Sequence, residues 1–325
     1  TNNIVKNQGP PPTQPTRRPI PTLPEAQKIV ATVVSKTASS VLIIFVGITL
    51  TLFFILRIFT IDRVIQMNME IALICAHIFL MFPVTTYEVP SLCRFVSICI
   101  HFFFTACFMF MMLEALHMYS LVAHVVKKDG LLSKMKNIVV GWGVSFVIIV
   151  FCVCFEYDNY GGEYHCWLQM DTPLWLGQLF PMLMITIVTL TLIEAAGAAE
   201  YKHLKGMDDT QLLSAKISQR TNLIILPFVI AHMLVGMLSE YEQNLPLYGI
   251  FSILNGITGG LVFFLHCSNN QQASYIILIL LYFSFINNSI RYFNCSIIHS
   301  CGITQLMWQM KNYIGSLLYF LIYFV

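Results

Sequence analysis

The chain has 325 residues, of which 57% are hydrophobic and 10% are charged, and its mean hydropathy is +0.73. Soluble domains carry about 25% charged residues, so this composition excludes a water-soluble globular protein, which could not cover its own surface. The 18 Lys and Arg residues nearly balance the 16 Asp and Glu residues, which argues against nucleic acid as a partner.

Seven stretches are apolar and long enough to cross a bilayer, which takes about 20 residues per helix. They are Ala38–Phe59, Val64–Val84, Cys93–Val125, Asn137–Phe155, Leu174–Ile193, Thr221–Glu240 and Pro246–Cys267. We therefore expect an all-α membrane protein with a seven-transmembrane helix bundle over residues 38–267.

The two ends of the chain differ from this bundle. Seven of the 13 prolines lie in the first 24 residues, and we expect residues 1–37 to be a Pro-rich extracellular lead-in, a fragment of a longer ectodomain. Residues 268–325 form an atypical C-terminal tail. Its apolar runs, Tyr275–Ile286 and Tyr313–Val325, are too short to span a membrane comfortably, and we interpret the tail as a misread gene end.

The loop charges predict the orientation of the bundle. One set of loops holds a single basic residue, Arg94, and the other set holds ten. The ten are Arg57, Arg63, Lys127, Lys128, Lys134, Lys136, Lys202, Lys205, Lys216 and Arg220. Because Lys and Arg in short loops collect on the cytosolic side, the N-terminus is expected outside the cell.

That orientation gives two cysteines a common environment. Cys93 opens the third span on the outer side, and Cys166 lies in the outer loop between the fourth and fifth spans. Both face an oxidising compartment, where disulfides form and persist. We expect a disulfide between them, the alternative being two free thiols at the membrane edge.

Short motifs in successive spans narrow the class. They are His101-Phe102-Phe103-Phe104, Leu113-Glu114-Ala115-Leu116-His117-Met118-Tyr119, Gly141-Trp142-Gly143, Cys166-Trp167-Leu168, Trp175 with Pro181, Leu254-Asn255 and His266-Cys267. In this order they resemble the adhesion branch of the secretin-type superfamily of G-protein-coupled receptors, and within it the latrophilin-like group. The resemblance covers residues 38–267.

The resemblance implies a multi-pass plasma-membrane receptor, not an enzyme, that needs no cofactor or metal. Its partners would be heterotrimeric G proteins, membrane lipids, and an extracellular ligand or tethered peptide agonist. The lead-in Thr1-Asn2-Asn3-Ile4-Val5 lacks the apolar hexamer of such an agonist. Signalling would proceed by movement of the sixth helix.

The resemblance also implies an inner polar lock that holds the inactive state. Its members would be Gln66, Glu114, Asn222 and His266, with Gln66 and Asn222 standing where the family has His and Thr. Glu114 lies about 31 Å along the third helix from Cys93, near the inner edge of the bilayer core. The alternative is that Glu114 and His117 extend into the headgroup region without a switching role.

The sixth helix departs from the family pattern. Pro227 supports a kink, but Ile230 stands where the family has a permissive Gly, and Met233 stands where it has an agonist-sensing Trp. Gly236 is retained. The fold should tolerate these changes, whereas activation is expected to be weakened.

Several other polar or aromatic residues are candidates for the outer half of the bundle. Trp167, Trp175 and His101 are candidates for an outer loop and ligand cavity, with a hydrogen-bonded core histidine as the alternative for His101. Glu70 and His77 share a face of the second helix and are interpreted as hydrogen-bonding toward a neighbouring helix. His232 has no assigned role.

Three other classes remain open. A transporter would show repeated halves and buried charges along one path, and we find neither pattern. A membrane enzyme would show a catalytic or metal-binding motif, and His203 and His299 lack metal-ligand spacing. A non-signalling adhesion or scaffold protein on the same seven-helix frame is favoured by the altered sixth helix.

Overall fold

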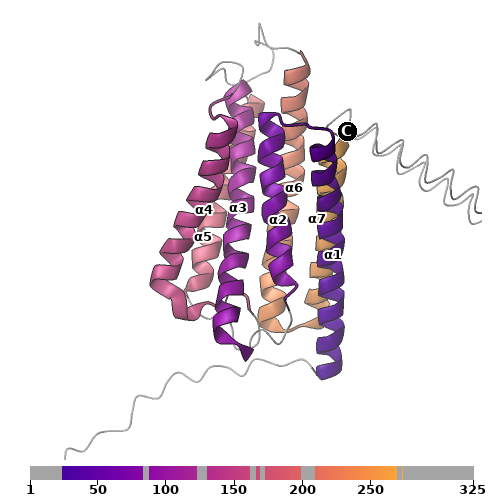
Figure 1. Cartoon of the computed structure of the whole chain (residues 1–325), viewed down its shortest axis with the longest axis vertical. Helices are drawn as coiled ribbons and strands as arrows, with labels where there is room; N and C mark the ends of the chain where they lie inside the picture. The colour runs from indigo at the N-terminus through magenta and orange to yellow at the C-terminus, as the bar shows by residue number, and fades with distance from the viewer. Residues whose placement is uncertain are drawn as a thin grey trace, which may run out of the picture. The chain divides into compact units, whose positions relative to one another are not determined.

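The computed structural model describes residues 24–82, 88–122, 130–161, 166–168, 173–198, 209–268 and 273. Within these residues it contains seven long helices and one short 3-10 helix (Figure 1). They are α1 (Glu25–Ile55), α2 (Ile61–Leu80), α3 (Pro90–Val122), α4 (Lys134–Glu156), η2 (Tyr157–Asn159), α5 (Leu174–Ala198), α6 (Asp209–Glu242) and α7 (Leu245–Ser268). The chain divides after residue 270, and the apolar runs expected in the C-terminal tail lie outside the described residues.

The seven long helices confirm the expected membrane bundle. Each is long and apolar enough to cross a bilayer, since even the shortest, the 20-residue α2, extends about 30 Å. Many large side chains on the outside of the bundle are apolar, among them Phe146, Val147 and Phe151 on α4, which are 61%, 67% and 64% exposed. Such side chains are stable where the surrounding solvent is lipid.

Two helices begin earlier than the expected spans. α1 begins at Glu25 rather than Ala38, and α6 begins at Asp209 rather than Thr221. Neither extension contains Pro or Gly, so nothing interrupts the backbone hydrogen bonds when the helix leaves the hydrocarbon core. Residues 25–37 therefore do not all belong to the expected lead-in, and the apolar part of α1 that can cross a membrane begins at Ala26.

α3 is the central helix of the bundle. It packs against α2, α4, α5 and α6, while α7 packs against α1 and α6. Phe104, Phe108 and Phe110 on α3 are at most 1% exposed and form the middle of the hydrophobic core. Because α3 touches four neighbours, a polar side chain on it can reach several helices at once.

Candidate functional site

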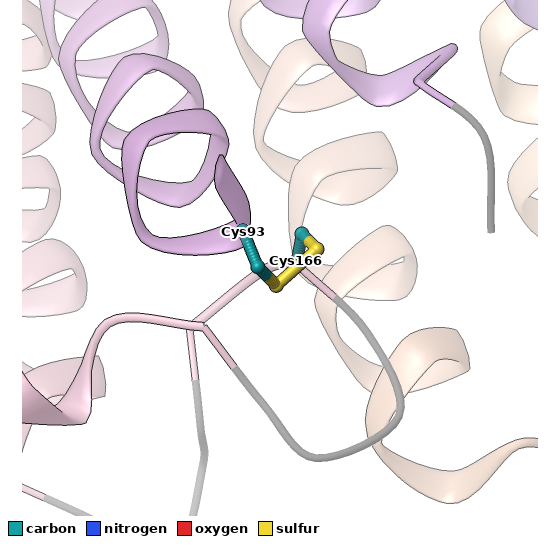
Figure 2. The surroundings of a disulfide bond; sticks show 2 residues. All are labelled: Cys93 and Cys166. Carbon is teal, nitrogen blue, oxygen red and sulfur yellow. A yellow bond between two sulfur atoms is a disulfide. The ribbon is translucent and has the colours of Figure 1, made fainter. Parts of the chain in front are cut away.

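The outer loop between α4 and α5 is tied to the start of α3. Figure 2 shows the disulfide between Cys93 and Cys166, whose Cα atoms are 4.9 Å apart although the residues are 73 positions apart in sequence. This confirms the expected disulfide. An isolated antiparallel bridge between Tyr160 and Leu168 closes the same loop.

Trp167, next to the disulfide, points into the bundle. Its side chain is 2% exposed and stacks on Phe104 of α3, with ring centroids 5.7 Å apart and planes 9° apart. A Cβ added at Gly236 on α6 would lie 3.0 Å from Trp167 Cη2, so the glycine makes room for the indole. The structure therefore places two of the expected residues, Trp167 and Gly236, in contact.

The other two outer candidates, His101 and Trp175, make different contacts. His101 is fully buried, and its Nδ1 lies 3.0 Å from the Tyr160 hydroxyl. Burial raises the pKa of the Tyr160 phenol, which therefore keeps its proton. His101 is thus a hydrogen-bonded core side chain that joins α3 to the outer loop. Trp175 is half-buried at the outer start of α5 and packs against the core.

Near the cytosolic ends of the helices, Glu114 is the centre of a polar cluster. Its Oε1 accepts a hydrogen bond from Gln66 Nε2 on α2 over 2.6 Å and another from Ser218 Oγ on α6 over 2.5 Å. Glu114 is 2% exposed, so its carboxylate faces the inside of the bundle. A single acceptor oxygen on α3 thereby links three helices.

Asn222 and His266 take other partners than Glu114. Asn222 Nδ2 donates to the carbonyl of Met111 on α3 over 2.9 Å, which gives α6 a second bond to α3 about one turn from Ser218. His266 Nδ1 on α7 lies 2.5 Å from Glu70 Oε1 on α2. The four expected lock residues therefore lie in two neighbouring clusters, one around Glu114 and one around Glu70.

Arg63 connects the two clusters. Its Nη1 donates to Gln66 Oε1 over 2.7 Å and to the carbonyl of His266 over 3.2 Å. The side chain is 5% exposed, although charge patterning placed it among the cations of the inner loops. The guanidinium also forms an ion pair with Asp62, its Nε lying 3.5 Å from Asp62 Oδ2, and such pairing matters because burying unpaired charge in a membrane protein is costly. Arg63 lies three residues before Gln66 and seven before Glu70, a spacing that places the three side chains on one face of α2. This spacing is the sequence feature from which the role of Arg63 could have been predicted.

Ser218 and Glu70 are the other members of the inner clusters that the expected lock did not include. Ser218 is 5% exposed and Glu70 is fully buried. A serine in a long helix carries no distinctive pattern, because it usually bonds to its own backbone. The sequence predicts that Glu70 hydrogen-bonds to a neighbouring helix, and its partner there is His266 on α7.

Pro227, Ile230 and Met233 lie along one continuous α6. Pro227 is exposed on the outside of the bundle, Ile230 is half-buried, and Met233 is fully buried. The Met233 sulfur lies 3.4 Å from Gln178 Nε2 on α5. The position expected for an agonist-sensing aromatic residue therefore holds a thioether that is bonded to the neighbouring helix.

Comparison with known proteins assigns the chain to a family. The profile described as 7 transmembrane receptor (Secretin family) matches residues 25–262. Adhesion G-protein coupled receptor D1 of Bos taurus is 26% identical over 215 residues, which cover 64% of this chain and 23% of that receptor. Cadherin EGF LAG seven-pass G-type receptor 1 of Homo sapiens is 27% identical over 212 residues, covering 64% of this chain and 7% of that protein.

A third relative is matched over more of its own length. This putative adhesion G protein-coupled receptor of Homo sapiens is 26% identical over 254 residues, which cover 72% of this chain and 55% of that protein. The chain thus spans just over half of this relative and about a quarter or less of the other two. Assignment to the latrophilin-like group stays a prediction. With seven membrane-spanning helices, the outer disulfide and a profile match over most of its length, this multi-pass plasma-membrane protein belongs to the secretin family of seven-transmembrane receptors and resembles its adhesion-type members.

Proposed function

We propose that the chain is an adhesion-type receptor that passes an extracellular or tethered-peptide signal to heterotrimeric G proteins by movement of α6. The observation that carries the proposal is the attachment of the cytosolic half of α6 to α3. Ser218 donates to Glu114, and Asn222 donates to the Met111 carbonyl. An inward-facing cavity for a G protein requires α6 to leave α3, and these two bonds oppose that movement.

The free energy of the two bonds between α6 and α3 is in the range expected for a protein that alternates between two conformations. A buried hydrogen bond contributes about 0.5–1.5 kcal/mol net, and one to a charged group about 1.5–3 kcal/mol. Two such bonds amount to a few kcal/mol, and a free-energy gap of this size leaves the minor state of a two-state protein populated at about 0.1–10%. When α6 moves, Glu114 keeps its bond from Gln66, so its carboxylate is not left without a partner.

The cytosolic ends of α4 and α6 are basic. Lys134 and Lys136 on α4 and Lys216 and Arg220 on α6 are exposed. Such residues are attracted to the anionic lipids of the cytoplasmic leaflet. They support the proposed orientation and the interaction with membrane lipids, and they surround the part of the bundle that α6 would open.

A second function, a non-signalling adhesion or scaffold protein, is favoured by one observation. Met233 is buried against Gln178, and the β-branched Ile230 follows Pro227 by three residues. β-branched side chains restrict χ1 in a helix and crowd the preceding turn, so they oppose bending just beyond the proline. Such a receptor would keep the fold and lose efficient activation.

Basal signalling separates the two functions. The full chain would be expressed in cells with a panel of G proteins, and dissociation of Gα from Gβγ would be recorded at matched surface expression. Ser218→Ala removes the donor from α6, and Glu114→Gln weakens the acceptor, so both variants should raise basal activation. Ser239→Ala is the matched control, because Ser239 is a buried serine on the same helix that donates to the Gly236 carbonyl of its own helix.

The control should behave as the unsubstituted chain does. If none of the G proteins responds to the chain, to Ser218→Ala or to Glu114→Gln at normal surface expression, signalling is refuted and the scaffold function is retained.

A further inference from the structure

Two buried histidines join α2 to α6 in the outer half of the bundle. His77 Nε2 lies 3.4 Å from His232 Nε2, and the ring centroids are 5.4 Å apart. Both side chains are fully buried. This contact is separate from the inner clusters, and the proposed function has not used it.

The remaining ring nitrogens define the direction of the hydrogen bonds in the neutral pair. His232 Nδ1 lies 3.2 Å from the carbonyl of Phe228, and a carbonyl only accepts, so this nitrogen carries the proton of His232. His232 Nε2 is then an acceptor, and His77 Nε2 must donate to it. His77 Nδ1 consequently accepts from the Ser39 hydroxyl on α1, 3.2 Å away. A single chain of hydrogen bonds therefore connects α1, α2 and α6.

Aromatic rings from α3 and the outer loop enclose this chain. The Phe104 ring lies 6.2 Å from the His77 ring and 5.7 Å from the His232 ring, and Trp167 stacks on Phe104. Trp167 also approaches α6 at Gly236, one turn beyond His232. Rings on this side exclude water, which would otherwise compete for the histidine nitrogens.

The position of Pro227 separates two attachments of α6. On the cytosolic side of Pro227, Ser218 and Asn222 hold the helix to α3. On the outer side, His232 holds it to α2. Pro227 cannot donate the usual backbone hydrogen bond to the carbonyl of Leu223, so the helix bends most easily between the two attachments.

We propose that the His77–His232 pair anchors the outer half of α6 to α2, so that displacement of α6 is confined to the part of the helix before Pro227. That the displacement of α6 serves signalling rests on the proposed function. The contact between His77 and His232 does not, because it is present in the receptor without ligand. His77 and His232 are thus positioning residues: they hold one end of α6 still while the other end moves.

Distances between paired spin labels test the anchor. Labels at Ile78 on α2 and Leu238 on α6, which are 47% and 37% exposed, report the outer half of α6. Labels at Met135 on α4, which is 67% exposed, and at the exposed Arg220 on α6 report the inner half. Both pairs would be introduced into the full chain with its free cysteines replaced by serine, and measured in purified receptor without ligand.

Breaking the anchor should release only the outer pair of labels. We expect His232→Phe and His77→Phe each to add a longer-distance population to the Ile78–Leu238 distribution. The double variant should add no more than either single one, because the two residues act as a pair. His101→Phe is the matched control, since His101 is an equally buried histidine of α3 that bonds to Tyr160 and not to α6, and it should leave the distribution unchanged.

Each outcome decides the proposal. The proposal is overturned if the folded single variants, His77→Phe and His232→Phe, show the same Ile78–Leu238 distance distribution as His101→Phe. It is also overturned if the double variant adds a longer-distance population equal to the sum of those of the two single variants. A third contrary outcome is that Ser218→Ala shifts the outer label distance as far as it shifts the inner one. Should Ser218→Ala leave the inner Met135–Arg220 distance unchanged, the proposed movement of α6 fails, while the outer distribution still decides the anchor. Because either histidine can be replaced, failure of one variant to fold leaves the other as the test.

Discussion

Gly141 on α4 lies so close to Phe110 on α3 that a Cβ on the glycine would come within 2.3 Å of the ring atom Cε1. Two residues further on, no heavy atom of a described neighbouring side chain or helix lies within 4 Å of the corresponding position of Gly143. Between them, Trp142 donates its indole N–H to Asn68 Oδ1 on α2 over 2.9 Å. In the Gly-Trp-Gly motif, therefore, only the first glycine is required by close packing.

Replacing each of the two glycines by alanine should change the stability of the receptor differently. Gly141→Ala forces the fully buried Phe110 ring to move, and overpacking of this kind costs about 1–3 kcal/mol. Gly143→Ala adds a methyl group in open space and improves helix propensity, so it should be neutral or slightly stabilising. Thermal unfolding of the purified receptor in detergent measures both, and equal midpoints for the two variants would contradict the packing account.

Glu70 and His266 should be energetically coupled. Removing one partner leaves the other buried without its hydrogen bond, at a cost of about 1–3 kcal/mol, so Glu70→Ala and His266→Ala should each lower the thermal midpoint. The double variant should lose much less than the sum, because it leaves neither group unpaired. Thermal unfolding of the four proteins of the cycle measures the coupling. Additive losses would show that the contact between Glu70 and His266 contributes little.

Loss of the outer disulfide should destabilise the bundle through Trp167. Cys166→Ser removes the link to Cys93, which frees the loop that places Trp167 on Phe104. Native disulfides typically contribute about 2–5 kcal/mol, so we expect a lower thermal midpoint and reduced surface expression. Cys154→Ser is the control, because Cys154 is an exposed free cysteine. A reducing agent should lower the midpoint of the unsubstituted chain and leave that of Cys166→Ser unchanged.

A side chain at Gly130, at the cytosolic end of the bundle, should destabilise the receptor. Its φ of +75° is in the left-handed region, and a Cβ there would lie 2.5 Å from His117 Nδ1 on α3. The backbone conformation alone costs a non-glycine residue about 1–3 kcal/mol, and the contact with His117 adds to it. Gly130→Ala should therefore lower the thermal midpoint, whereas Gly47→Ala, where none of the described neighbours lies within 4 Å, should not. A loss no larger than that of Gly47→Ala would refute this prediction.

Much of the fold follows from properties that can be counted along the chain. A span requires only enough consecutive apolar residues, so all seven helices were predictable, including the interrupted stretch Leu174–Ile193 with Pro181. The disulfide was predictable because Cys93 and Cys166 share a compartment once the orientation is known. The helix starts differ from the prediction: α1 begins at Glu25 and its apolar span at Ala26, whereas α6 begins at Asp209, seven residues before its apolar span at Lys216.

The partners of the polar residues were less accessible to the same reasoning. The spacing of Arg63, Gln66 and Glu70 places them on one face of α2, but it does not say which neighbour that face meets. His266 was expected beside Glu114 and bonds to Glu70 instead. His232, which had no assigned role, bonds to His77.

Length, hydropathy and charge along the chain were therefore sufficient to determine the membrane bundle, its orientation and the cysteine pair, because each depends on one helix or one compartment at a time. Only the tertiary structure decided which polar groups meet. Those contacts depend on the depth and rotation of each helix against its neighbours, and these are set by close packing such as that of Gly141 against Phe110.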